Sequence, residues 1–172
     1  MTEQITSVET PTASGGAIHA ETAGPKRVLA VASGGGHWVQ LKRLWQAFEG
    51  QELIVVTTDA GYEDEVDCHA FHVVTDANMQ SKIRLVRLAM EMALIVFRER
   101  PEVVISTGAA PGYFALRFGK MVGAQTIWVD SLANAEVLSM SGMKVQRYAD
   151  LWLTQWPHLA KGQGPYYFGS VV

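Results

Sequence analysis

Short apolar runs recur along the chain, and glycine, proline or polar residues bound each of them. Strands that are buried on both faces give such continuous apolar runs, so these segments predict strands of a parallel sheet. Apolar residues at helical spacing, such as Leu41, Leu44, Trp45 and Phe48, predict helices between them. The alternation of strands and helices predicts a doubly wound, Rossmann-like α/β domain. The predicted strands lie at 28–32, 53–56, 71–74, 103–105, 126–129 and 151–153.

The longest predicted helix covers 81–98 and ends before Pro101. Its polar residues form one narrow stripe, and the remainder is apolar almost all round. A helix of this kind is either deeply buried or lies against an apolar surface. We expect one face on the sheet and part of the rest on a membrane or a partner, since basic residues suit anionic lipid headgroups. The residues that we expect at the membrane are Lys82, Arg84, Arg87, Leu88 and Met92.

The beginning of the chain differs in composition from the rest. Residues 1–25 are rich in Thr, Ser, Gly, Ala and Glu and have no apolar periodicity, which predicts a disordered tail. The remaining residues, 26–172, are numerous enough to bury the core of one domain.

Composition narrows the classes of function. The net charge is -3 and the pI is about 5.9, which argues against a nucleic-acid partner. Cys68 is the only cysteine, so an internal disulfide is excluded, and neither zinc-ligand spacing nor an Asp-x-Asp motif is present. We also find no signal-peptide pattern and no uncharged apolar stretch of about 18 residues. We therefore expect a cytoplasmic protein that is soluble or peripheral on a membrane, without a metal.

Three loops are candidates for chemistry, because ligands of doubly wound folds bind at the carboxyl ends of the strands. The first loop contains Ser33, Gly34, Gly35 and Gly36 and leads through His37 into a helix. Its glycines allow close approach of the backbone, and the helix start suits an anion or a sugar hydroxyl. His37 suits a general base or a hydrogen-bond donor. The loop matches neither a Walker loop nor GxGxxG, and a plain strand-to-helix turn is the alternative.

The second and third candidate loops are less specific. In the second, 106–112, Thr107 and Gly108 precede Pro111 at a helix start, and this loop suits a phosphate or forms an ordinary turn. In the third, 130–136, Asp130 and Ser131 follow a strand. Asp130 is a candidate for orienting a hydroxyl or accepting its proton, and capping the next helix is the alternative.

Over about 140 residues the sequence resembles the asparagine-linked glycosylation protein 14 family, including its bacterial PssD-type exopolysaccharide members. The order and spacing of several short motifs carry the resemblance, and Gln155-Trp156-Pro157 and the closing Tyr/Phe-Gly element are the most specific of them. The motifs lie at 32–37, 101–108, 129–131, 138–142, 149–157 and 166–169.

The resemblance implies the acceptor-binding lobe of a split GT-B glycosyltransferase, similar to the N-terminal half of the peptidoglycan GlcNAc transferase. The implied partner, of the asparagine-linked glycosylation protein 13 type, holds most of a UDP-sugar, which is a co-substrate rather than a cofactor. The pair extends a polyprenyl-pyrophosphate-linked saccharide at the cytosolic membrane face, as in polysaccharide biosynthesis. We expect the partner to contact Gln155, Trp156, Tyr167 and Gly169.

The sequence departs from the family pattern in several places. Asp130 stands where the family has Glu, Asn134 stands where it has Arg, and a polar tail replaces the membrane anchor of the eukaryotic members. The length leaves no room for a second α/β lobe, which favours a subunit. Two alternatives remain at this point: a scaffold that only recruits the catalytic subunit to the membrane, and a self-sufficient small UDP-sugar enzyme.

Overall fold

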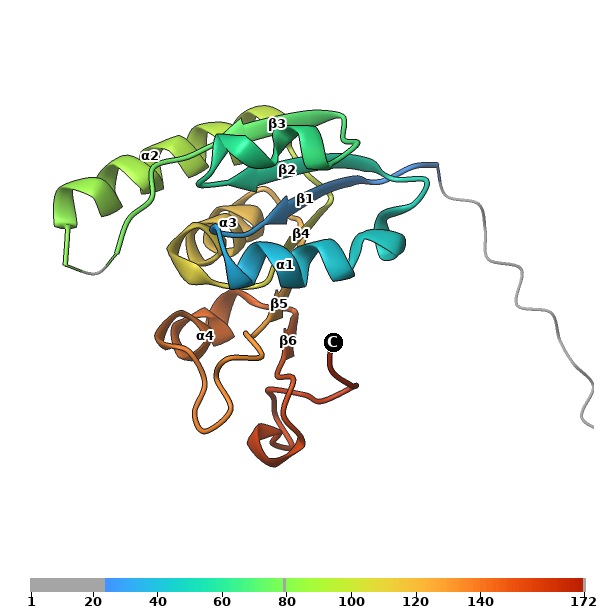
Figure 1. Ribbon diagram of the computed structural model, residues 1–172, viewed down its shortest axis with the longest axis vertical. Helices are drawn as coiled ribbons and strands as arrows, with labels where there is room; N and C mark the ends of the chain where they lie inside the picture. Colours follow the sequence, from blue (N-terminus) through green and yellow to red (C-terminus); the bar gives the residue numbers. More distant parts are fainter. Residues whose placement is uncertain (1–23, 79, 172) are drawn as a thin grey trace, which may run out of the picture.

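The computed structural model describes residues 24–78 and 80–171. Its centre is a six-stranded sheet in the order β3-β2-β1-β4-β5-β6, and every neighbouring pair is parallel. All six predicted strands are present, and the doubly wound α/β prediction is confirmed (Figure 1). The strands are β1 (Arg27–Val31), β2 (Glu52–Thr57), β3 (Ala70–Val73), β4 (Val103–Ser106), β5 (Gln125–Val129) and β6 (Leu151–Leu153).

The helices cover both faces of the sheet. They are α1 (Gly36–Arg43), α2 (Lys82–Glu99), α3 (Ala109–Met121) and α4 (Met140–Val145), with short 3₁₀ turns at Trp45–Phe48, Ala60–Glu65, Gln146–Tyr148 and Pro157–Leu159. The helix α1 packs on one face through Trp38 and Leu41, and α2 and α3 pack on the other. The tail that we predict at 1–25 lies outside the described residues except for its last two positions.

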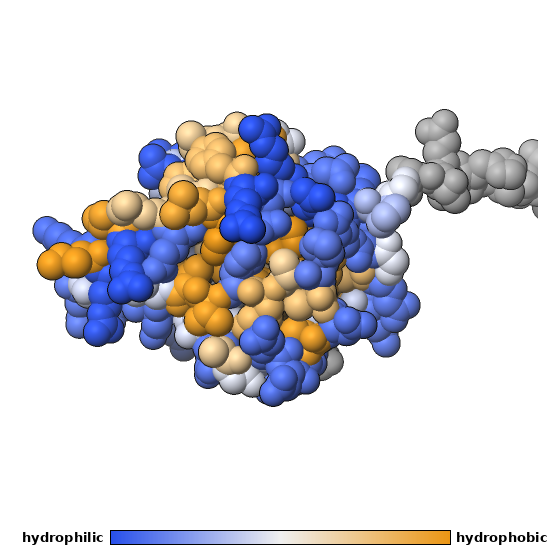
Figure 2. All heavy atoms as spheres, turned by 90° about the horizontal axis from the view of Figure 1, so that it is seen from above, coloured by the Kyte–Doolittle hydropathy of each residue, from blue (hydrophilic) through white to orange (hydrophobic). Residues whose placement is uncertain are grey.

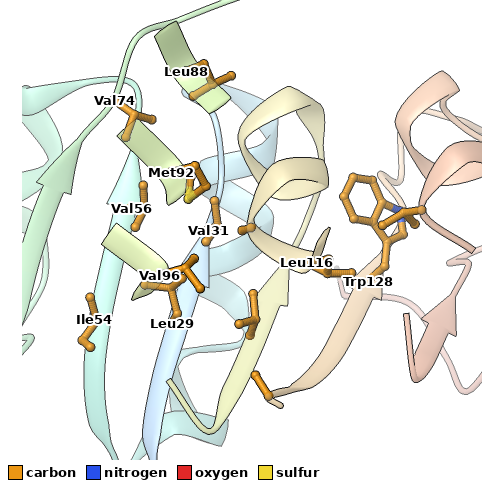
Figure 3. Close-up of a cluster of buried hydrophobic side chains, with 14 of the residues drawn as sticks. Leu29, Val31, Ile54, Val56, Val74, Leu88, Met92, Val96, Leu116 and Trp128 are labelled. Atoms are coloured by element: carbon orange, nitrogen blue, oxygen red, sulfur yellow. The ribbon is translucent and has the colours of Figure 1, made fainter. Parts of the chain in front are cut away.

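The core has two halves because successive side chains of a strand point to opposite faces. From β1, Leu29 and Val31 point toward α2 and α3, whereas Val28 and Ala30 point toward α1. Figure 3 shows the first half, in which Leu88, Met92 and Val96 of α2 meet the side chains of β1 and β2. All three of these α2 side chains are fully buried. Complete burial of one such side chain stabilises the fold by about 1.5–3 kcal/mol.

The burial of α2 corrects two of the expected membrane contacts. Leu88 and Met92 have no exposed surface, so they belong to the core and cannot meet a membrane. The outer face of the helix is nevertheless largely apolar, and its predicted contact with a membrane or a partner stays a prediction. Figure 2 shows apolar residues at the surface among hydrophilic ones in a view from above. The exposed stripe of α2 consists of Ile83, Val86, Met90, Leu94 and Phe97, which are 85, 60, 63, 70 and 44% exposed.

The C-terminal segment closes the β6 edge of the sheet. The Tyr166 amide donates to the Trp152 carbonyl at 2.8 Å, and the Thr154 amide donates to the Tyr166 carbonyl at 2.9 Å. This short parallel pairing satisfies backbone groups that an edge strand would otherwise leave open. Within the described ranges, no helix combines the length and apolarity that crossing a bilayer requires.

Candidate functional site

The two glycine loops meet at the centre of the sheet. The strand β1 pairs with both β2 and β4, and the chain leaves β1 toward α1 but leaves β4 toward α3 on the opposite face. This is the point where the strand order reverses, and ligands of doubly wound folds bind outside the strand ends there. The first and second candidate loops therefore belong to one site.

His37 links the two loops through a pair of hydrogen bonds. Its Nδ1 lies 2.9 Å from the Thr107 carbonyl oxygen, and the Thr107 hydroxyl donates to the His37 carbonyl at 2.8 Å. A carbonyl oxygen only accepts, so Nδ1 carries the proton of the neutral ring. The other ring nitrogen, Nε2, is then left with a lone pair that can accept a proton.

The backbone of Gly108 lies in close contact with the His37 ring. Its φ is 142°, and a Cβ built at this position would lie 2.3 Å from Cε1 and 2.4 Å from Nδ1 of His37. No side chain fits between the imidazole and this backbone. The glycine predicted in the second loop is therefore needed for the placement of His37, a role different from the predicted contact with a phosphate.

The backbone amides of two glycines in the first loop are hydrogen-bonded within the protein. The Gly34 amide donates to the Thr58 hydroxyl and the Gly35 amide donates to the Tyr62 hydroxyl, each at 3.1 Å. The Tyr62 ring in turn stacks on Trp38 with centroids 4.6 Å apart. These two amides are therefore engaged within the protein, and close approach of the backbone stays the predicted role of Gly34 and Gly35. The amides that open α1, beginning with Gly36, precede the first hydrogen bond within that helix and point toward the strand ends.

Thr107 and Ser33 have different surroundings. Thr107 is fully buried, and its hydroxyl is engaged with His37, so its predicted contact with a phosphate is wrong. Ser33 is half-buried where β1 runs into the loop, which is compatible with contact to a ligand. The residue after Gly108, Ala109, has a φ of 65°, a left-handed conformation that costs a residue with a Cβ about 1–2 kcal/mol. Such strain is often found at functional sites.

Asp130 holds the third loop together and does not point into open space. It is 1% exposed, and it accepts hydrogen bonds from the Ser139 amide at 2.8 Å and the Ser139 hydroxyl at 2.6 Å. The Ser139 hydroxyl accepts from the Gly142 amide and so caps α4. The geometry thus favours the capping alternative for Asp130, through Ser139, over direct contact with a substrate hydroxyl.

A buried amide network lies beside Asp130. Gln40 donates to the Ser131 hydroxyl at 3.0 Å, and Gln155 donates to the Gln40 side-chain oxygen at 2.6 Å and to the Asp130 carbonyl at 2.9 Å. Ser131 is 5% exposed and Gln155 is 2% exposed. The Ser131 oxygen is therefore engaged within the loop, and the buried Gln155 side chain is not exposed for direct contact with a partner. Nothing in the local sequence marks Gln40, which stands on the buried side of α1.

The other predicted partner contacts lie nearer the surface. Trp156 is half-buried and donates from its indole nitrogen to the Leu132 carbonyl at 2.9 Å. Tyr167 is 38% exposed, and Gly169 is exposed as well. Their neighbour Phe168 is 78% exposed, so its ring is the most open of the C-terminal aromatic side chains.

A pocket that the sequence analysis did not anticipate opens beside the second loop. It has a volume of about 460 Å³ and is bounded by the start of α2, the first turns of α3, and α4. Burial and the neighbouring Tyr148 hydroxyl raise the pKa of Tyr113 in its wall, so this side chain stays neutral. The aromatic pair Tyr113-Phe114 just after Pro111 was the available signal in the sequence. Among the described residues, no group of His, Cys, Asp or Glu side chains is arranged to hold a metal ion.

Comparison with known families gives a match over more than half of the chain. The family model described as "Oligosaccharide biosynthesis protein Alg14 like" matches residues 72–171. A relative from Yarrowia lipolytica, the UDP-N-acetylglucosamine transferase subunit ALG14, is 34% identical over 73 residues. That match covers 39% of this chain and only about a third, 34%, of the relative. The protein of the same name from Eremothecium gossypii is 25% identical over 181 residues, and the match covers 86% of this chain and 81% of the relative.

Solved structures agree with the architecture. MurG from Acinetobacter baumannii superimposes with a TM-score of 0.66 at 11% identity, covering 85% of this chain and 46% of the MurG chain. The UDP-N-acetylglucosamine 2-epimerase from Rickettsia bellii superimposes with a TM-score of 0.60 at 13% identity, covering 78% of this chain and 40% of the epimerase. This chain thus spans less than half the length of either protein. At these identities the likeness concerns the fold.

Proposed function

Because this chain belongs to the Alg14-like family of oligosaccharide biosynthesis proteins, we propose that it is the acceptor-binding subunit of a two-component glycosyltransferase. Its relatives are named UDP-N-acetylglucosamine transferase subunits, which supports a UDP-sugar donor and a further subunit. In this proposal the chain is one GT-B-type lobe, and a separate protein of the asparagine-linked glycosylation protein 13 type binds most of the donor. The acceptor is a saccharide on polyprenyl pyrophosphate, extended during polysaccharide biosynthesis.

The observation that carries the proposal is the placement of His37. Its ring lies at the switch point of the sheet, fixed by the Thr107 carbonyl and by contact with Gly108, with Nε2 left to accept a proton. In the proposed step, Nε2 takes the proton of the acceptor hydroxyl while the hydroxyl oxygen attacks the anomeric carbon of the sugar. The bond from that carbon to UDP breaks, UDP leaves, and the configuration at the carbon inverts. General base catalysis of this kind typically contributes about 10²–10⁴ in rate.

The remaining site residues position the acceptor. The amides at the start of α1, beginning with Gly36, together with Ser33, are available for a phosphate group of the acceptor or of the donor, because helix starts favour negative charge. Asp130 acts indirectly, through Ser139: its carboxylate holds the Ser139 side chain that caps α4. We therefore assign Asp130 a positioning role rather than the catalytic role expected from its strand end.

Contact with the cytosolic face of a membrane is proposed through α2. The exposed stripe of α2 runs along the helix, and Lys82, Arg84 and Arg87 are exposed near the start of the same helix. Basic side chains beside an apolar stripe suit a surface of anionic lipids. A peripheral subunit held in this way would meet an acceptor that is itself anchored in the membrane.

The partner surface is proposed at the C-terminal segment. Tyr167, Phe168 and Gly169 are exposed, and aromatic side chains are enriched at the centres of protein interfaces. Gln155 supports this surface from within, since it accepts from the Val171 amide at 2.8 Å and its carbonyl accepts from the Ser170 hydroxyl at 2.7 Å.

Reconstitution tests the proposal. The chain, a donor-binding partner and the pair would each be assayed for transfer of GlcNAc from UDP-GlcNAc to a polyprenyl-pyrophosphate-linked acceptor. We expect transfer by the pair and none by either protein alone. Transfer by this chain alone would contradict the two-component proposal and favour a self-sufficient UDP-sugar enzyme. Full transfer by the partner alone on soluble acceptor analogues would favour the scaffold.

A further inference from the structure

The pocket between α3 and α4, hereafter the α3–α4 pocket, has a mostly apolar wall; among its described lining residues, Asn78 and Ser141 are polar and Lys144 alone is charged. Its volume of about 460 Å³ falls in the range of about 300–1,000 Å³ that is usual for small-ligand pockets. Leu85, Tyr113, Phe114 and Met140 supply the apolar side chains, and Lys144 supplies the charge. An apolar pocket with a single cation suits an amphiphile that has an apolar body and an anionic end.

The pocket adjoins the site at the strand ends. Ala109 and Ala110 form part of its wall and directly follow Gly108, on which the His37 ring lies. Ala109 is also the residue with the strained φ of 65°. A ligand whose apolar part fills the pocket therefore has its other end beside the second loop and the start of α3, where the backbone amides favour negative charge.

We propose that the α3–α4 pocket binds the isoprene units next to the pyrophosphate of the lipid acceptor, with Lys144 beside the pyrophosphate itself. This inference rests on the proposed function and adds a place for the lipid part of the acceptor. The pocket is too small for a whole polyprenyl chain, so the remainder leaves it. Leu85 stands on the same first turns of α2 as Ile83 and Val86, which belong to the exposed stripe of α2. The free end of the chain can therefore pass toward the surface proposed to meet the membrane.

Binding to the full chain tests the inference without a partner or a sugar. Farnesyl pyrophosphate, farnesol and inorganic pyrophosphate would be titrated calorimetrically below the micelle concentration of the lipids. We expect farnesyl pyrophosphate to bind at least about tenfold tighter than either fragment, because only it fills the pocket and reaches Lys144. Lys144→Ala should weaken farnesyl pyrophosphate about fivefold and leave farnesol unchanged.

Two matched substitutions on α4 locate the ligand. Met140 lines the pocket and is 56% exposed, whereas Met143 does not line it and is 52% exposed. Met140→Trp adds bulk at the pocket wall and should weaken farnesyl pyrophosphate at least about tenfold. Met143→Trp should stay within about twofold of the unchanged protein. Both positions are on the surface, so both variants should fold, which circular dichroism would check.

Several outcomes would overturn the inference. They are equal affinities for the two tryptophan variants, pyrophosphate binding as tightly as farnesyl pyrophosphate, and loss of binding in Met90→Asp but not in Met140→Trp. The last result would place the lipid on the exposed stripe of α2. Failure of the proposed function looks different: the reconstituted pair would transfer no sugar, while farnesyl pyrophosphate would still bind in a Met140-dependent manner.

Discussion

At the scale of single residues, the site depends on how closely His37 and Gly108 approach each other. The ring of His37 occupies the space where any Cβ on residue 108 would stand. The hydrogen bond from Nδ1 to Thr107 then fixes the rotation of the ring. The position of Nε2 is thus set by backbone atoms of the second loop, which are less free to move than side chains.

Gly108→Ala should therefore lower transferase activity by more than its loss of unfolding free energy can explain. The new Cβ forces the imidazole aside, and a displacement of about 1 Å at a reacting group can cost about 100-fold in rate. Gly50→Ala is the control, because Gly50 also has a positive φ, 75°, but nothing lies within 4 Å of its added Cβ. Both variants should lose about 1 kcal/mol or more of unfolding free energy. Equal activity of the two variants in the reconstituted pair would contradict this account of His37.

Glu91 gives a prediction about acid stability. Burial favours the neutral carboxyl, but hydrogen bonds from the Thr75 amide, Arg87 and the Thr75 hydroxyl outweigh it and hold the pKa of Glu91 below its usual 4.5. The unfolded chain then binds this proton more readily than the folded chain does. The stabilisation from Glu91 is present above about pH 4.5 and is lost as the pH falls through the lower, folded pKa.

The measurement is urea unfolding of the unchanged protein and of Glu91→Gln between pH 7 and pH 3. The variant should be less stable at pH 7, and the gap between the two proteins should narrow on acidification. A gap that stays constant with pH would show that the pKa of Glu91 is not lowered by folding.

Residue chemistry was only partly predictable from the sequence. His37 was identified because a histidine after a glycine loop at a strand end has few ordinary structural roles. The sequence leaves two roles open for Asp130 and does not show that the Thr107 hydroxyl is engaged, because the partners of both side chains lie outside their loops. His37 is 70 positions from Thr107, and Ser139 is nine positions from Asp130. Local sequence does not show which polar atoms are already engaged.

At the scale of elements, α2 has apolar residues on two faces, one buried in the core and the other exposed. Leu88, Met92 and Val96 form the core face, and the exposed stripe of α2 forms the other. The sequence predicts the extent of this helix to within a residue at each end and its packing on the sheet. It does not distinguish the core face from the outer face, because the polar stripe is narrow and the rest of the helix is apolar almost all round.

Paired substitutions on α2 separate these two faces. Met92→Ala should lower the unfolding free energy by about 2–5 kcal/mol, because it leaves a cavity in the core. Met90→Ala should change it by no more than about 0.5 kcal/mol. For vesicles that contain anionic lipids, Met90→Asp should weaken binding about fivefold or more, through loss of apolar burial and added negative charge. Unchanged vesicle binding by Met90→Asp would contradict the proposed membrane contact.

At the scale of the whole molecule, the strand order places the glycine loops of β1 and β4 side by side. The fold was predictable because the strands are short and largely apolar, and most of them alternate with helices, a pattern with few alternatives. The α3–α4 pocket was not predictable, because its wall combines residues 77–78 with separate turns of α2, α3 and α4 that only the folded chain brings together. The fold supplies a site at the strand ends, an apolar pocket beside it and a basic apolar surface, which together match a lipid-linked acceptor.

The central claim is that this subunit contributes the catalytic base, and the turnover number of the reconstituted pair tests it most directly. His37→Gln should lower turnover at least about 100-fold with little change in KM for the UDP-sugar. His69→Gln is the matched control, since His69 directly precedes the edge strand β3 and so lies at the amino ends of the strands, away from the site. Its Nε2 lies 3.3 Å from Glu52 Oε1. This control should keep turnover within about twofold. Full turnover by His37→Gln would contradict the claim and leave the chain as a scaffold for its partner.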